Sequence, residues 1–194
     1  MGLTKRNVTR RVRSGFGEAI QPTRRAPVRI VGMGEVKNVL TFRSVLWNDR
    51  DLLLQWRNDA VTRANSITNT FISRPVHEAW LRDSLAQPKR KLMIIEDENL
   101  PIGVLRFDAS EDGRVEVSIH LGPASRRKGF GRLALLQCEQ LVKEWLPQAH
   151  ELFAKVKRDN ASSRRAFEAA GFVETRQTDE IIYFCKQTES RKHC

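Results

Sequence analysis

The residues best suited to chemistry lie in one basic, glycine-containing turn, Arg126-Arg127-Lys128-Gly129-Phe130-Gly131-Arg132. A strand-like run, Val115 to Leu121, precedes this turn, and a helical pattern follows it. A helix that begins after such a turn leaves its first backbone N–H groups free to bind an anion. Gly129 and Gly131 have no Cβ atom, so a phosphate can approach the backbone closely. The turn therefore predicts a pyrophosphate site.

The glycine spacing excludes two common nucleotide motifs. No Gly-Lys-Ser/Thr follows the turn, as a nucleotide-binding P-loop requires, and the three-glycine dinucleotide fingerprint is also missing. A basic helix that simply starts after a tight turn would show the same glycines, so this turn alone leaves a purely structural alternative open.

A second pattern lies thirty residues further along the chain. The run Leu152–Val156 predicts a strand, and Asn160 is a good N-cap for the helix that follows. Gly171 followed by Phe172 is typical of a left-handed helix stop with a hydrophobic contact.

Together the two patterns resemble the GNAT superfamily of acetyl-CoA-dependent N-acetyltransferases. That family carries Arg/Gln-x-x-Gly-x-Gly/Ala after a splayed strand, then Asn-x-x-Ser-x-x-x-Tyr-x-x-x-Gly-Phe. The matching residues are Arg126, Gly129 and Gly131 in the first motif, and Asn160, Ser163, Gly171 and Phe172 in the second. Phe167 stands where the family often has Tyr. The resemblance covers about residues 39–186.

The resemblance implies that acetyl-CoA is the cosubstrate and that an amine receives the acetyl group. A backbone N–H near Leu121, at the end of the splayed strand, would stabilise the charge on the thioester oxygen. The implied cofactor-binding residues are Leu121, Arg126, Arg127, Lys128, Gly129, Phe130, Gly131, Asn160 and Ser163.

The candidate catalytic residues are Glu116 and His120, which alternate with Ser118 onto one strand face. Either can accept the amine proton, directly or through water. Alternatively, Glu116 pairs with a neighbouring basic residue and His120 lines a partly wet edge. The general acid stays unassigned because Phe167 has no hydroxyl group, and water or Ser163 remain open.

A narrower resemblance lies in the first half, in Gln55-Trp56-Arg57-Asn58-Asp59 and His77-Glu78-Ala79-Trp80. These runs look like the subgroup that acetylates 4-amino sugars on nucleotide carriers, as in pseudaminic acid biosynthesis. The candidate substrate-binding residues are Arg57, Asn58, His77 and Trp80. Packing of Trp80 and His77 in the core is the alternative. Acetylation of ribosomal-protein N-termini or polyamines, and a non-catalytic acyl-CoA-binding module, remain as other functions.

The elements that must position these residues indicate the α/β (α+β) class, with the GNAT fold: a mixed central sheet with splayed strands, flanked by helices. We expect the order β-α-α-β-β-β-α-β-α-β, with the sheet opening between two strands where the cofactor enters. The expected strands are 39–45, 91–96, 102–107, 115–121, 152–156 and 181–186, and the expected helices are 49–63, 75–86, a long one from about 130, and one from 160.

Composition gives the boundaries of this domain. The chain has 194 residues, of which 40% are hydrophobic and 29% charged, as in one globular domain. Residues 1–37 carry nine Lys or Arg against two Glu, which leaves only +4 of the net +11 for the rest. We predict a basic, disordered arm at 1–37, the acetyltransferase domain at 38–188 and a tail at 189–194. Met33 is an alternative start.

The sequence also bears on the cellular compartment, on metal and membrane binding, and on the partners of the protein. Three cysteines without metal-ligand spacing favour a reducing, cytoplasmic compartment, and the four scattered histidines suggest no metal. No apolar run is long enough for a membrane span. We expect a small-molecule amine as partner, a nucleotide sugar among the candidates, in a monomer or homodimer. Nucleic-acid binding is not expected, because the domain shows no basic stripe with interleaved aromatic residues.

Overall fold

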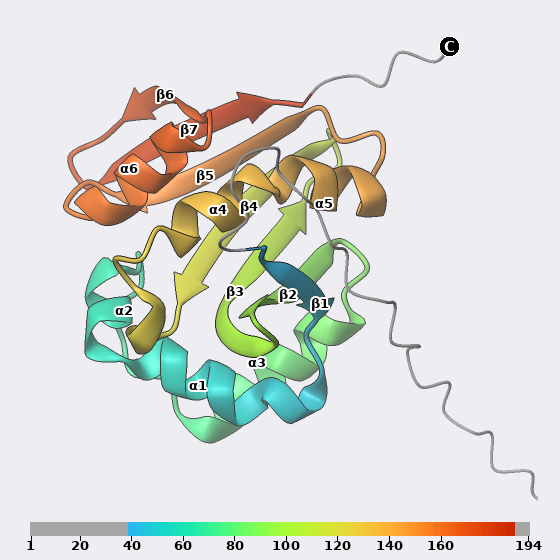
Figure 1. The fold of residues 1–194 in the computed structure, drawn as a ribbon, viewed down its shortest axis with the longest axis vertical. Coiled ribbons are helices and arrows are strands. Elements are labelled where there is room, and N and C mark those ends of the chain that lie inside the picture. Colours follow the sequence, from blue (N-terminus) through green and yellow to red (C-terminus); the bar gives the residue numbers. More distant parts are fainter. Residues whose placement is uncertain (1–38, 189–194) are drawn as a thin grey trace, which may run out of the picture.

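The structure is a computed structural model that describes residues 39–188. The predicted arm, the tail and the alternative start at Met33 lie outside the described residues. Seven strands form one sheet in the order β1-β2-β3-β4-β5-β7-β6 (Figure 1). The strands are β1 (Thr41–Ser44), β2 (Arg90–Asp97), β3 (Leu100–Ala109), β4 (Arg114–Leu121), β5 (Glu151–Lys157), β6 (Val173–Gln177) and β7 (Ile181–Gln187). The helices are α1 (Arg50–Asn58), α2 (Ala60–Asn65), α3 (Arg74–Ala86), α4 (Phe130–Leu136), α5 (Cys138–Trp145) and α6 (Ala161–Ala169).

The sheet opens between β4 and β5, the one parallel pair within residues 39–188. These strands pair only from Arg114 opposite Glu151 to Glu116 opposite Phe153, and then diverge (Figure 1). Every other neighbouring pair is antiparallel. The mixed sheet with splayed strands, predicted from the family resemblance, is therefore confirmed.

Alternating side chains divide the core between the two faces of the sheet. On one face, α4 and α5 bury Phe130, Ala134 and Cys138 against strand residues that include Leu105 and Val117. The other face of β2 packs on α1 and α3 in a smaller cluster of Val45, Leu53, Trp56, Leu81, Leu92 and Ile94. Both clusters remove apolar surface from water, so the sheet is held from two sides.

The predicted helix 49–63 breaks into α1 and α2 at Asp59. This residue has an extended ψ of 137°, and its carboxylate accepts a hydrogen bond from the Thr62 N–H at 3.0 Å. Asp59 thus caps a new helix rather than continuing the old one. The predicted long helix is likewise interrupted at Gln137, between α4 and α5.

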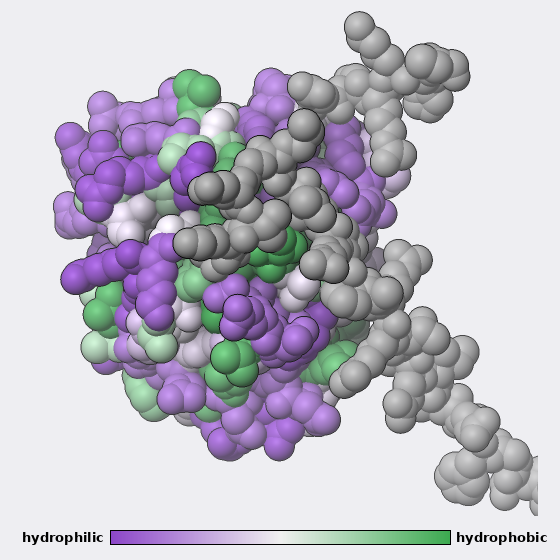
Figure 2. Space-filling view, in the orientation of Figure 1, coloured by the Kyte–Doolittle hydropathy of each residue, from purple (hydrophilic) through white to green (hydrophobic). Residues whose placement is uncertain are grey.

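The expected element order omits β6, which pairs with β7 at the edge of the sheet. All five of its residues are exposed, so the hydrophobic alternation typical of a strand is missing. Figure 2 shows that hydrophilic side chains dominate the visible surface and that hydrophobic ones form small, scattered groups. Within residues 39–188, no helix has the length and apolar character of a membrane span.

Candidate active site

A cavity of about 410 Å³ opens where β4 and β5 diverge. Its walls come from the second half of β4, the end of β5, the start of α6, the turn before α4, and α2 with the connection after it. The cavity brings together nine of the predicted site residues: Arg57, Glu116, His120, Leu121, Arg126, Arg127, Gly131, Asn160 and Ser163. The predicted residues Asn58, His77, Trp80, Lys128, Gly129 and Phe130 are not among its lining residues.

The turn before α4 has the backbone that the glycines predict. Gly129 has a φ of +83°, and Arg127 has a φ of +62°, which is uncommon for a residue with a side chain. The helical hydrogen bonds begin with the Leu133 N–H to the Gly129 carbonyl at 3.2 Å. The N–H groups before Leu133 therefore have no earlier helical carbonyl to bind. Because the Phe130 side chain is buried in the core, only its backbone can contact a ligand.

The side chain of Arg126 does not contribute free charge to this turn. Its guanidinium donates to the Asp59 carboxylate at 2.5 Å, to the Thr62 hydroxyl at 2.7 Å and to the Leu121 carbonyl at 3.3 Å. Arg126 therefore ties the turn and the end of β4 to the cap of α2. The sequence predicts a phosphate contact for this residue, whereas the structure gives its guanidinium a bridging role between elements.

The start of α6 is built as predicted. The Asn160 side chain accepts a hydrogen bond from the Ser163 N–H at 3.1 Å, which confirms the N-cap. At the other end, Gly171 has a φ of +85° and the Phe172 N–H bonds to the Phe167 carbonyl at 3.1 Å. The cap uses the Ser163 N–H, so the hydroxyl is the Ser163 donor that the cap leaves available at this lining residue.

Phe167 lines the cavity at the position where the family often has Tyr. Its ring is 3% exposed, meets Phe172 edge-on at 5.0 Å and stacks on Phe184 at 5.9 Å between centroids. The tyrosine of the chain, Tyr183, is not a lining residue, although it lies opposite Lys155 in the β5–β7 register. Neither ring therefore offers a hydroxyl proton inside the cavity.

Glu116 is the one carboxylate among the lining residues, and it is not alone. Its Oε2 accepts a hydrogen bond from Lys155 Nζ at 2.8 Å, across the point where β4 and β5 separate. This contact matches the alternative in which Glu116 pairs with a basic neighbour. The pair nevertheless lies in the wall of the cavity, so both groups can reach a bound ligand.

His120 lies four residues beyond Glu116 along β4, on the same face. Burial, together with the positive charges of Arg106, Arg57 and Arg126, lowers the pKa of His120 to about 4. The imidazole is therefore neutral near pH 7. Protonation would create a partly buried cation among three guanidinium groups, which opposes a role as proton acceptor.

Arg57 and Asn58 hold the connection between α2 and α3. Arg57 Nη2 donates to the Thr68 carbonyl at 2.7 Å, while the Asn58 amide both donates to and accepts from the backbone of Ile72, at 2.7 and 2.9 Å. Arg57 Nη1 is buried with no hydrogen-bond partner in the described part of the chain. Arg57 thus keeps a donor for a ligand, whereas both polar atoms of the Asn58 amide are used in structure.

His77 and Trp80 lie on α3, away from the cavity lining. The His77 imidazole is 2% exposed, lies 2.9 Å from the Arg50 carbonyl and contacts the Trp80 ring at 5.6 Å. Burial lowers the pKa of His77, so the ring is held neutral between two helices. His77 therefore fits the packing alternative, whereas Trp80 is 36% exposed on α3, and neither residue lines the cavity.

A family model described as an acetyltransferase (GNAT) domain matches residues 40–173. The chain belongs to the GNAT acetyltransferase family. The match confirms the predicted enzyme class, an amine N-acetyltransferase with acetyl-CoA as its cosubstrate. A sequence search of curated proteins finds no match.

Solved structures share the fold of this GNAT domain at low identity. Spermidine N-acetyltransferase from Vibrio cholerae, in complex with CoA and spermine, gives a TM-score of 0.70 at 16% identity over 78% of this chain and 96% of its own. Aminoglycoside acetyltransferase AAC(6')-Ib with coenzyme A gives 0.67 at 17% identity, over 76% and 94%. The protein yncA of Salmonella typhimurium, with its cofactor acetyl-CoA, gives 0.64 at 20% identity, over 79% and 96%.

The lining residues fit acetyl-CoA by their chemistry. The turn before α4 offers unbonded N–H groups and the Arg127 side chain to a pyrophosphate, while the gap between β4 and β5 can take an extended chain. A Cβ atom on Gly131 would lie 3.7 Å from Leu121 Cδ1 and 3.9 Å from Ala166 Cβ, so this glycine keeps space open between β4 and α6. Within residues 39–188, no group of His, Cys, Asp and Glu is placed to hold a metal ion.

Sequence reasoning did not identify Arg106 or the connection Asn65–Thr68 as parts of the cavity. Arg106 lies opposite Ser118 in the β3–β4 register, is a lining residue and forms an ion pair with Asp108 at 2.8 Å. That position depends on strand register, which the sequence of β3 does not specify. The connection after α2 has no regular pattern, so only the fold shows that it closes the cavity.

Proposed function

We propose that this GNAT enzyme acetylates a primary amine on a negatively charged acceptor, with the 4-amino group of a nucleotide-linked amino sugar as the leading candidate. The observation that carries this proposal is the charge of the cavity. Its cationic lining residues are Arg57, Arg106, Arg126, Arg127 and Lys155, and Glu116 is the single acidic one. Arg126 pairs with Asp59, Arg106 with Asp108 and Lys155 with Glu116, so Arg57 and Arg127 are the lining cations without an ion pair among the described residues. Such a wall favours anions and disfavours polycations.

For acetyl-CoA, we propose contacts from backbone and side chains around the turn. The N–H groups of Phe130 and Gly131, with the Arg127 and Lys128 side chains, would bind the pyrophosphate. Ser163 would contribute its hydroxyl, and Asn160 would fix the start of α6. The backbone near Leu121 would stabilise the thioester oxygen as it gains charge.

For the acceptor, we propose that Arg57 binds an anionic group through its unpartnered Nη1, because a buried donor without an acceptor is costly until a ligand supplies one. Glu116 then serves as the proton acceptor in preference to His120. Glu116 carries the hydrogen bond to Lys155 within the cavity wall, whereas burial and three guanidinium groups oppose protonation of His120.

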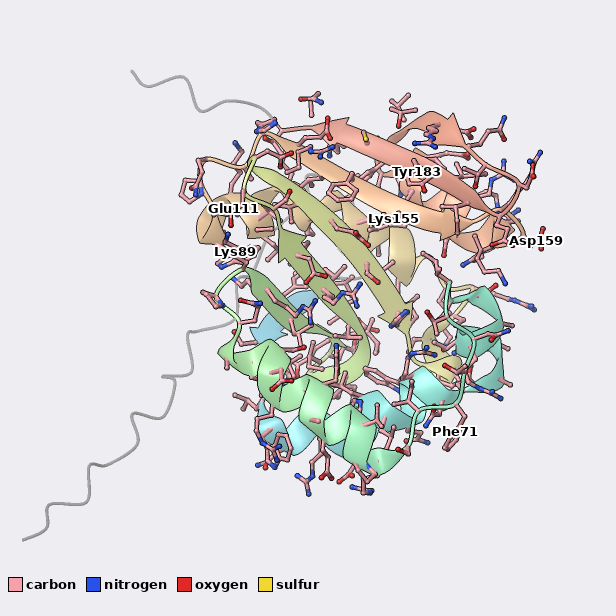
Figure 3. The ribbon with its side chains drawn as sticks, turned by 180° about the vertical axis from the view of Figure 1, so that it is seen from behind. Phe71, Lys89, Glu111, Lys155, Asp159 and Tyr183 are labelled. Atoms are coloured by element: carbon pink, nitrogen blue, oxygen red, sulfur yellow. The ribbon has the colours of Figure 1, made fainter. Side chains whose placement is uncertain are left out.

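A polycationic amine is the second candidate, and the fold neighbours favour it. Two of them are a spermidine N-acetyltransferase and an aminoglycoside acetyltransferase. The exposed face beside the cavity, which carries acidic residues such as Asp159, would then have to supply the contacts (Figure 3). Among the described residues, Cys138 and Cys185 are free thiols. Free thiols favour a reducing compartment, and we propose the cytoplasm.

A panel of acceptors tests these proposals. CoA release and the mass of the product are measured with a UDP-linked 4-amino sugar, spermidine, kanamycin and a peptide with a free N-terminus. We expect the highest kcat/KM for the UDP-linked amine, and a gain of one acetyl group on its 4-amino nitrogen. A clear preference for spermidine or kanamycin would reject the anionic acceptor but keep the enzyme class, and no CoA release with any amine would reject amine acetylation.

A further inference from the structure

The Glu116–Lys155 ion pair occupies the point at which the sheet opens. Lys155 projects from β5, beside the strand that carries Tyr183, on the face seen in Figure 3. Glu116 is the last β4 residue paired with β5, and the 2.8 Å contact spans the two strands just before they separate. Both side chains line the cavity together with Phe167. A carboxylate, an ammonium group and a hydroxyl-free ring therefore share one wall.

Acetyl transfer needs one group that accepts a proton and one group that donates a proton, and both must line the cavity. The attacking amine loses a proton, and the sulfur that leaves with the bonding electron pair must gain one. Phe167 cannot donate a proton, and Tyr183 does not line the cavity. Among the lining residues, Lys155 is the cation hydrogen-bonded to the candidate base, while Arg57, Arg106, Arg126 and Arg127 hold their protons too tightly to act as acids.

We propose that Glu116 and Lys155 form a proton relay that takes the place of the missing tyrosine hydroxyl. This inference rests on the acetyl transfer proposed above. The amine nitrogen forms a C–N bond with the thioester carbonyl carbon, and the C–S bond then breaks. Glu116 takes the proton from nitrogen, Lys155 gives its proton to sulfur, and Glu116 passes the first proton to Lys155 across their hydrogen bond. One proton thus moves from amine to thiol, and the ion pair is restored.

Each step of the relay prepares the next. A protonated Glu116 no longer neutralises the ammonium group of Lys155, and loss of a counter-charge lowers the pKa of a lysine. The ammonium therefore becomes a better acid at the moment when the sulfur needs a proton. The side chain of Lys155 is 39% exposed and that of Glu116 is 22% exposed, so a bound thioester can approach both groups.

Four variants test the relay by steady-state kinetics with the best acceptor of the panel. We expect Lys155→Gln to lower kcat by about 10²-fold while the Kd for acetyl-CoA stays unchanged. Lys155→Arg keeps the charge but not the acidity, so it should lose nearly as much. Adding Phe167→Tyr to Lys155→Gln should restore at least tenfold of the loss. Tyr183→Phe, a matched control on the neighbouring strand, should keep the kcat of the parent.

Three results would overturn the relay and leave acetyl transfer standing. They are a wild-type kcat for Lys155→Gln, full activity of Lys155→Arg, and loss of activity in Tyr183→Phe as large as that in Lys155→Gln. The pH profile gives a second readout, because removal of the lysine acid should abolish the alkaline limb of the kcat profile. Failure of the wild-type enzyme to acetylate any amine is a different outcome, which rejects the proposed function itself.

Discussion

Glu116 and His120 share one face of β4, and the structure separates their roles by charge. Glu116 accepts a hydrogen bond from Lys155 at 2.8 Å, and both residues line the cavity. His120 is neutral because burial and three guanidinium groups lower its pKa to about 4. Burial and the guanidinium groups therefore oppose protonation of His120, and we propose Glu116, which is hydrogen-bonded to Lys155, as the proton acceptor.

Replacing Glu116 by Gln keeps the shape of the side chain and removes its capacity to take a proton. We expect kcat/KM to fall by about 10²- to 10⁴-fold, as is typical for loss of a general base. The affinity for acetyl-CoA should change little. Kinetics and calorimetry measure both, with Ser118→Ala on the same strand face as the control. Equal activity of Glu116→Gln and Ser118→Ala would move the base elsewhere.

The lowered pKa of His120 makes stability depend on pH. The unfolded chain takes up a proton near the ordinary pKa of 6.5, whereas the folded protein does so only near 4. Stability from this residue is therefore present above pH 6.5 and is lost as the pH falls toward 4.

Urea unfolding of wild type and His120→Gln at several pH values measures this effect. We expect a weaker loss of stability in the variant between pH 6.5 and 4, with a difference on the order of 1–3 kcal/mol. Identical pH dependence of the two proteins would show that His120 is not held neutral. His77, whose pKa is also lowered, is present in both and cancels in the comparison.

Among the secondary-structure elements, the first residues of helices form much of the cavity lining. The turn before α4, the capped start of α6 and the break between α1 and α2 all meet at one end of the cavity. Asp59 links two of these features, because its carboxylate caps α2 and accepts the guanidinium of Arg126. The position of α2 in the cavity wall is thereby tied to the cofactor turn.

Two substitutions of Asp59 separate its two roles. Asp59→Ala removes the cap and the partner of Arg126, so it should cost about 1–2 kcal/mol of unfolding free energy. Asp59→Asn keeps an oxygen for the Thr62 N–H and should cost clearly less. Chemical denaturation measures both. Equal losses in the two variants would mean that charge, and not capping, holds α2.

Gly131 controls access to the turn. A Cβ atom fits there at ordinary contact distances, so Gly131→Ala should fold normally. Gly131→Val adds bulk between Leu121 and the start of α4, and it should weaken acetyl-CoA binding by roughly tenfold or more, the equivalent of one charge-assisted contact. Calorimetry gives the affinity, and a thermal melt confirms the fold. Unchanged affinity in a folded Gly131→Val protein would contradict the pyrophosphate site.

Local signals account for what the sequence predicts well. The cap at Asn160, the left-handed stop at Gly171 and the buried face of α4 and α5 each depend on neighbours in sequence, and the structure confirms them. The expected helix 49–63 runs across Asp59, so the cap to the Thr62 N–H was not predicted, and β6 was not predicted because all five of its residues are exposed. The bridging role of Arg126 joins residues 67 positions apart, which no local pattern reveals.

In the whole molecule, the cationic residues that line the cavity come from elements that are far apart in the sequence. Arg57 comes from α1, Arg106 from β3, Arg127 from the turn and Lys155 from β5. No local run of the sequence shows this basic wall. Among the described residues it is the feature that distinguishes an anionic acceptor from a polycation.

Arg57→Met removes one charge from the wall and should raise KM for an anionic acceptor by about tenfold, because hydrogen bonds to charged groups contribute roughly 1.5–3 kcal/mol. KM for spermidine should stay the same or fall. Kinetics with both amines measures the change, and Arg63→Met, on neighbouring α2, is the matched control. An equal rise of KM for both acceptors would indicate damage to the connection that Arg57 holds at Thr68.

We propose that acetyl-CoA binds where β4 and β5 diverge, against the turn before α4. Titration of isotope-labelled protein with acetyl-CoA, followed by amide NMR, tests it residue by residue. We expect the largest shifts at Leu121, at Gly129 to Arg132 and at Ser163, with little change along α3. Shifts concentrated outside the cavity, or none at saturating acetyl-CoA, would contradict the account.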